Sequence, residues 1–181
     1  MKKNNFLGKL SSFLSIGYAI PGLILAVGIT RFLVFADRNI FSDLDFVITG
    51  SLVGLVLAYI IKSYALANSS IESGYERISN SIDNSARLLG ARGSILLGKV
   101  HFPLMKTSFL TAILLVTSEV VKELPATLIL RPFNFDTLAV VTYTYAAEER
   151  MYQAAMPSLA IVLIGIIPLI FLSKMIRSSR L

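Results

Sequence analysis

The chain has 181 residues, of which 55% are apolar and only 15% are charged, and this composition excludes a water-soluble globular protein. Because each crossing of a bilayer uses about 20 residues, little remains for a separate soluble module, and we expect a single membrane domain over 1–181. The absence of cysteine excludes disulfides and thiolate chemistry. The formal charge of +6 is scattered along the chain, which argues against a nucleic-acid partner.

Four apolar stretches predict an all-α membrane protein with about four transmembrane helices. Pro21 and Gly22 interrupt the first stretch and predict a kink there. In the second stretch Gly50, Gly54 and Ala58 recur every four residues, which predicts a smooth strip for close helix packing. The predicted spans are about 11–36, 46–67, 104–124 and 154–173.

The segment 68–103, between the second and third spans, is polar but carries a helical pattern. Apolar residues at intervals of three and four in its first half predict a short amphipathic helix. Gly90 and Gly93 then predict a bend, and the apolar group 95–102 predicts a second short helix. Pro103 suits the first turn of the third span. Such a loop either docks a soluble partner or packs beneath its own bundle, and periodicity alone leaves both open.

The basic residues predict the orientation of the spans, because Lys and Arg near span ends stay on the cytoplasmic side. With four spans, the N-terminus, the 68–103 loop and the C-terminus share one side, and the segment 125–153 is external. The shared side carries twelve of the 17 basic residues. We therefore predict that both termini and the loop are cytoplasmic. The twelve are Lys2, Lys3, Lys9, Lys62, Arg77, Arg87, Arg92, Lys99, Lys106, Lys174, Arg177 and Arg180.

Charged residues also gather at the outer end of the third span. Glu119, Lys122 and Glu123 have the spacing of one helical face. Charges at membrane depth usually face a bundle interior or water. They either line or gate a pathway, or they form a structural ion pair. With His101 as the one histidine, neither a multi-histidine metal site nor a nucleophilic catalytic site is expected.

The loop resembles a known motif. The stretch from Asp83 to Ala91, followed by His101–Leu104, is similar to the EAA loop of permease subunits of binding-protein-dependent ABC importers. That loop carries a Glu-Ala-Ala triplet, a glycine four residues later and a proline that begins the next span. Asp83 adjoins the position of the missing glutamate and is a candidate replacement for it. The corresponding positions are Asn84, Ser85, Ala86, Gly90 and Pro103, and within the triplet only Ala86 matches.

A second segment sharpens the resemblance. The run from Lys122 to Ala139, together with the run from Gly17 to Gly22, is similar to iron(III) importer permeases. The resemblance implies a type I ABC importer permease (MetI-like) core that is incomplete at the N-terminus. It also implies a bacterial inner-membrane location and an external segment, with Arg131, Asn134 and Asp136, on the side where the binding protein docks; ordinary solvation of that segment is the competing interpretation.

The resemblance predicts a permease component of an ATP-driven importer, with iron(III) as the first substrate to consider. It implies an ABC ATPase subunit, a periplasmic substrate-binding protein, a second permease half or a homodimer, and membrane lipid as partners. ATP would be bound by the partner subunit, so we expect no cofactor, no metal and no enzymatic activity in this chain. The alternatives are a non-transporting assembly or regulatory subunit and a secondary carrier.

Overall fold

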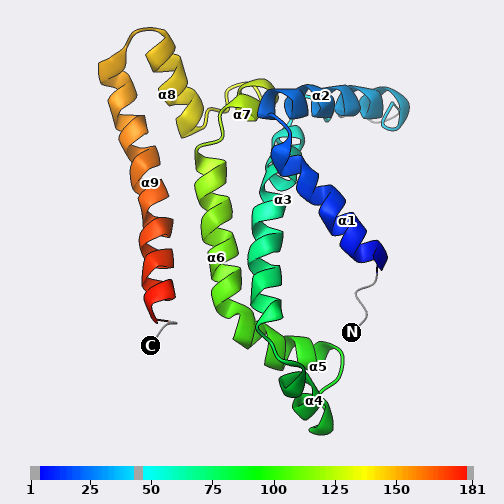
Figure 1. The fold of residues 1–181 in the computed structure, drawn as a ribbon. Helices are drawn as coiled ribbons and strands as arrows, with labels where there is room; N and C mark the ends of the chain where they lie inside the picture. Colours follow the sequence, from blue (N-terminus) through cyan, green and yellow to red (C-terminus); the bar gives the residue numbers. More distant parts are fainter. Residues whose placement is uncertain (1–4, 43–46, 179–181) are drawn as a thin grey trace. The chain divides into compact units, whose positions relative to one another are not determined.

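The chain is built from helices joined by short turns (Figure 1). The structure is a computed structural model and describes residues 5–42 and 47–178. No strand occurs within these ranges, so the all-α prediction is confirmed. The elements are α1 (Asn5–Ser15), the 3-10 helix η1 (Ile16–Ala19), α2 (Gly22–Asn39), α3 (Leu52–Glu76), α4 (Asn80–Leu88), α5 (Ser94–Leu96), the π-helical segment η2 (Leu97–His101), α6 (Phe102–Val121), α7 (Pro125–Leu130), α8 (Leu138–Ala147) and α9 (Met151–Ser178).

Three helices of the described residues are long and apolar enough to cross a bilayer: Leu52–Glu76, Ser94–Val121 and Met151–Lys174. A fourth candidate is the pair Gly8–Ala19 and Gly22–Asn39, which is bent by 114°. The structure therefore holds three spans, or four when the bent pair counts as one. This agrees with the prediction of about four transmembrane helices.

The bend between α1 and α2 arises at Ile20 and Pro21. Ile20 has extended backbone (φ −73°, ψ 127°), as residues before proline usually do. Pro21 also leaves helical geometry (ψ 133°), and its carbonyl accepts the first hydrogen bond of α2 from the Leu25 N–H at 3.0 Å. The predicted kink is present, but two successive non-helical residues divide the stretch into two helices instead of bending one.

The second predicted span lies further along the chain than expected. Helix α3 begins at Leu52, because the residues before it form a turn tied to the end of α2. The Asp37 carboxylate accepts hydrogen bonds from the backbone N–H groups of Ile48 and Thr49, each at 2.9 Å. The helix then continues to Glu76, through polar residues that were assigned to the loop. The serine hydroxyls at 69, 70 and 73 donate to backbone carbonyls of the preceding turn, so these polar groups find hydrogen-bond partners within the helix itself.

The described residues group into two compact units, one drawn from 5–42, 47–65 and 118–167 and the other from 66–117 and 168–178. The core of the first unit is formed by α2, α3 and α7. Ala58 is fully buried in this core, and a Cβ added at Gly54 would lie 2.9 Å from Leu33 Cδ1, so both residues allow close packing. Gly50 of the predicted strip lies outside α3, in a turn at φ +80°. The buried core residues are Leu25, Ala26, Ile29, Leu33, Leu55, Ala58, Ala126 and Leu130.

In the second unit the C-terminal turns of α3 pack against the start of α6. Gly74 is buried there, and a methyl group at this position would overlap the Ser108 side chain. Met105 is buried at the same contact. This close approach fixes the two helices from which the 77–101 segment extends.

Candidate functional site

Backbone hydrogen bonds close the C-terminal end of the short helix α4. The Ala91 N–H donates to the Ala86 carbonyl at 2.9 Å, and the Gly90 N–H donates to the Arg87 carbonyl at 3.0 Å. These two bonds form a Schellman motif, which requires a left-handed residue at the position of Gly90. Gly90 has φ +87°, and Gly93, which precedes α5, has φ +51°. The predicted amphipathic helix and glycine bend are therefore present.

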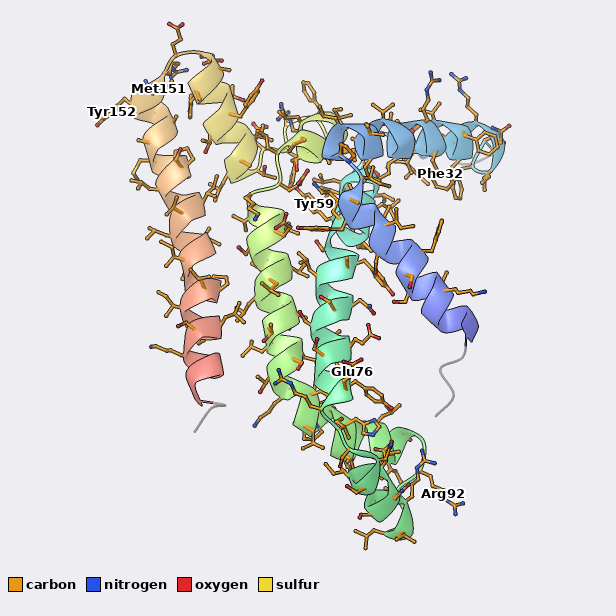
Figure 2. All side chains as sticks on the ribbon, viewed as in Figure 1. Phe32, Tyr59, Glu76, Arg92, Met151 and Tyr152 are labelled. Atoms are coloured by element: carbon orange, nitrogen blue, oxygen red, sulfur yellow. The ribbon has the colours of Figure 1, made fainter. Side chains whose placement is uncertain are left out.

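The surface of α4 carries exposed apolar side chains beside cations. None of its residues is buried, and Leu88 and Leu89 are each 89% exposed. Arg87 and Arg92 line a hollow of about 440 Å³ next to this apolar tip. Figure 2 shows Arg92 beside α4 and α5, with its side chain directed away from these helices. Within the described residues neither arginine has an acidic group within 4.0 Å. The two exposed leucines and the two arginines form an apolar patch with a charged rim. Such a patch is typical of a surface that binds a partner.

Asp83 and His101 join α4 to the following helix. His101 Nε2 lies 2.7 Å from Asp83 Oδ1, and because a carboxylate only accepts, the imidazole donates this bond. His101 is buried, and its ring meets Tyr75 of α3 edge-on, with centroids 5.5 Å apart and planes at 82°. In the sequence, this histidine served only to exclude a multi-histidine metal site and a nucleophilic catalytic site, and no partner was predicted for it. The sequence did contain a signal for this pair, because an acidic residue, Asp83, and the one histidine lie on either side of the glycine bend.

The second predicted short helix is not a separate element. Ser94 to Val121 form one continuous helix, in which η2 widens to π-helical hydrogen bonding and the Phe102 N–H donates to the Leu97 carbonyl. Pro103 therefore lies inside a longer helix instead of starting one. A proline lacks the N–H and crowds the carbonyl four residues earlier, and the π-helical segment accommodates both defects.

The residues at the triplet positions differ in exposure. Asn84 and Ser85 are exposed, while Ala86 is half-buried. The Asp83 side chain is only 19% exposed, since its carboxylate is turned toward His101. Asp83 is thus engaged within the chain.

The predicted charged group of Glu119, Lys122 and Glu123 divides into two sets. Helix α6 ends at Val121, so the three residues do not share one helical face. Lys122 pairs with Glu119 at 2.9 Å, with side chains 59% and 24% exposed. Glu123 instead accepts a bond from Lys62 at 2.7 Å, and both of these side chains are largely buried, at 8% and 16% exposure. Lys62 is therefore an interior charge of α3, and not one of the cytoplasmic loop charges.

Glu123 also organises the start of α7. Its carboxylate accepts from the Ala126 N–H at 3.1 Å, near the helix N-terminus where negative charge is favourable. The Thr127 hydroxyl donates to the Glu123 carbonyl at 2.8 Å and so accepts from the Tyr59 hydroxyl, also at 2.8 Å. Tyr59 is labelled in Figure 2. A Cβ at Gly22 would lie 2.9 Å from Glu123 Oε1, so the start of α2 meets the same point. Sequence reasoning missed Lys62, Tyr59 and Thr127 as members of this group.

The predicted residues of the external segment form a turn between α7 and α8. Arg131 and Asp136 are joined as an ion pair, and Asn134 has a left-handed backbone with φ 60°. The Phe135 N–H donates to the Pro132 carbonyl at 3.2 Å. This closed turn presents Phe133, which is 94% exposed.

Comparisons with known proteins find permeases. The chain is 26% identical over 158 residues to the Fe(3+)-transport system permease protein FbpB 2 of Haemophilus influenzae, covering 87% of this chain and 29% of that protein. It is 28% identical over 172 residues to a protein of Salmonella typhimurium named as the 2-aminoethylphosphonate transport system permease protein PhnV, covering 95% of this chain and 62% of that protein. The PhnV protein of Salmonella typhi is 27% identical over 172 residues. No protein-family model matches the chain.

These relatives confirm the resemblance to ABC importer permeases that the sequence indicated. Together with the apolar helices they also support a multi-pass membrane protein. The chain spans less than a third of the length of the first relative and about three fifths of the second. The two relatives are named for different substrates.

Proposed function

We propose that this chain is a transmembrane permease component of an ATP-driven importer and that the 77–101 segment docks its ATPase subunit. The apolar tip of α4, Leu88 and Leu89 beside Arg87 and Arg92, carries this proposal. Burying a leucine contributes roughly 1.5–3 kcal/mol, so a groove that covers both would contribute roughly 3–6 kcal/mol toward binding. Acidic residues at the rim of that groove would pair with the two arginines. ATP is bound and hydrolysed by the partner.

The coupling requires that docking persist while the spans repack. A partner that stabilised the inward-open and outward-open forms equally would shift nothing. Helix α4 suits this role, because it extends from the C-terminal end of α3 and leads through η2 directly into α6. A movement of α4 therefore acts on two candidate spans.

For the substrate we propose iron(III), delivered by a periplasmic binding protein to the side that carries the Arg131–Asp136 turn. The Fe(3+) permease relative supports this choice, and the phosphonate permease relatives make an organophosphonate the substrate to test against it. We propose a second permease half or a second copy of this chain as the partner with which it forms the transport pathway; the chain itself covers only part of each relative.

The proposed location is the bacterial inner membrane, with the 68–103 loop and both termini in the cytoplasm. In this topology the bent pair α1–α2 counts as one broken span. A re-entrant pair would instead leave the N-terminus external, together with Lys2, Lys3 and Lys9, against the usual retention of basic residues inside.

The test is co-purification of this chain with a candidate ABC ATPase subunit from the same organism, using the double variant Leu88→Ala/Leu89→Ala. We expect the variant to retain its fold, since neither side chain is buried, and to lose the ATPase. The matched control is Phe133→Ala, which removes another exposed apolar side chain and should retain the ATPase. A stable complex of the unmodified chain with another soluble protein and no ATPase would favour the regulatory-subunit alternative. Uptake driven by an ion gradient without ATP would favour a secondary carrier.

A further inference from the structure

Helix α4 needs a stiff connection to the spans if it is to move them. Its covalent connections are Arg77–Ser79 on one side and 89–93 on the other, and the second contains Gly90 and Gly93 at positive φ. The helix buries none of its own residues. Packing of α4 alone therefore gives little resistance to a pull on its exposed tip.

The Asp83–His101 hydrogen bond supplies a connection with a rigid far end. His101 is only 5% exposed and is the last residue of η2, in a helix that continues unbroken to Val121. Its ring forms a T-shaped contact with the ring of Tyr75, near the end of α3. The imidazole is thus fixed by two helices, and its Nε2 is aimed at the α4 carboxylate at 2.7 Å.

We propose that the Asp83–His101 pair is the link that transmits movement of α4 to α6, with Tyr75 holding the imidazole in position. The inference rests on the proposed docking of an ATPase at α4 and assigns a distinct role within it. Asp83 and His101 are positioning residues that act inside the chain, whereas Leu88 and Leu89 meet the partner. Asp83 therefore does not replace a partner-facing glutamate.

The experiment compares variants that remove the bond with variants that keep it. Asp83→Ala removes the acceptor, and His101→Phe removes the donor while keeping an aromatic ring against Tyr75. Asp83→Asn and His101→Gln retain an acceptor and a donor at these positions. The assembled transporter, reconstituted with its ATPase and binding protein, is assayed for ATPase retained and for substrate transported per ATP hydrolysed.

We expect Asp83→Ala and His101→Phe to retain the ATPase while transport per ATP falls about tenfold, the factor that loss of one hydrogen bond to a charged group corresponds to. Asp83→Asn and His101→Gln should recover most of it. The double variant Asp83→Ala/His101→Phe should be no worse than either single variant, because both remove the same interaction.

Three results would overturn the link. In the first, transport per ATP in Asp83→Ala remains at the level of the unmodified protein. In the second, Asp83→Ala loses the ATPase in proportion to transport, which would make Asp83 a docking residue. In the third, the effects of the two single variants add in the double variant. Asp83→Ala decides the question even when His101→Phe fails to fold, since Asp83 is less buried than His101 and belongs to a helix that buries none of its residues. If the unmodified chain recovers no ATPase, the proposed function itself fails, and this outcome is distinct from failure of the link.

Discussion

Removing Lys62, which belongs to a largely buried ion pair, should destabilise the chain far more than removing Lys122, which belongs to an exposed pair. The Lys62→Met variant keeps an unbranched apolar stem but leaves Glu123, which is only 7% exposed, without its cation. The carboxylate then retains the Ala126 N–H as its hydrogen-bond donor. A buried negative charge with so little compensation is costly, whereas the intact pair is neutral.

The expected size follows from the burial of the pair. Breaking a buried ion pair by removing one partner costs about 3–5 kcal/mol, whereas an exposed pair contributes roughly 0–1 kcal/mol. For a chain of this length each kcal/mol lowers the melting temperature by about 2–4 °C, so Lys62→Met should melt roughly 6–20 °C below the unmodified chain. Lys122→Met, whose side chain is 59% exposed beside Glu119, should melt within about 4 °C of it.

Thermal melts followed by far-ultraviolet circular dichroism in detergent micelles test this. The double variant Lys62→Met/Glu123→Gln leaves no unpaired charge, and the glutamine oxygen still accepts from the Ala126 N–H, so it should melt above Lys62→Met alone. Equal melting of the Lys62→Met and Lys122→Met variants, or a double variant less stable than Lys62→Met, would refute the assignment of a buried coupled pair.

Three further predictions concern the glycines and the topology. Gly22→Ala places a Cβ 2.9 Å from Glu123 Oε1 and 3.2 Å from Pro125 Cβ, so its melt should indicate a loss of stability of about 1–3 kcal/mol. Gly28→Ala has no atom within 4 Å of its Cβ and should gain about 0.5–1 kcal/mol of stability. Equal effects of the two variants would contradict the packing at Gly22. Gly90→Ala forces a side chain to φ +87° and should cost about 1–2 kcal/mol and weaken ATPase recovery; an unchanged melt would argue against the Schellman end of α4. Because the chain has no cysteine, single cysteines at Lys9 and Arg87 can be labelled without background, and both should react from the cytoplasmic face; labelling of Lys9→Cys from outside would indicate a re-entrant α1–α2 pair.

The helices were predictable from composition because spanning a bilayer requires long apolar stretches. Their ends were less predictable, since polarity marks the end of an apolar stretch and not the end of a helix. Helix α3 continues to Glu76, and the hydroxyls of the serines at 69, 70 and 73 bond to carbonyls of the preceding turn within it. The sequence predicts Pro103 in the first turn of a span, whereas in the structure the π-helical segment η2 precedes it and continues into α6 without a break.

The polar groups were harder to predict than the helices, because their partners lie far apart in sequence. Lys62 and Glu123 are separated by 61 residues, and Asp83 and His101 by 18. Sequence spacing relates charges on one helix, which is how Glu119 and Lys122 were found together, but it cannot relate residues on different helices. For this reason the sequence places Lys62 among the charges that predict the topology, whereas in the structure it pairs with Glu123 at the start of α7.

The loop motif is degenerate in a way that the structure explains. Gly90 and Ala86 match the motif, and both take part in the backbone bonds that end α4. Pro103, which also matches, lies beside the π-helical segment that joins α5 to α6. Asn84 and Ser85, which do not match, are exposed side chains on which the fold of the loop does not depend. The matching positions thus shape the backbone of α4, and the differing positions lie on its exposed surface. If α4 docks the proposed ATPase partner, that partner should carry a groove suited to leucine and arginine at α4, without a requirement for a glutamate at position 84.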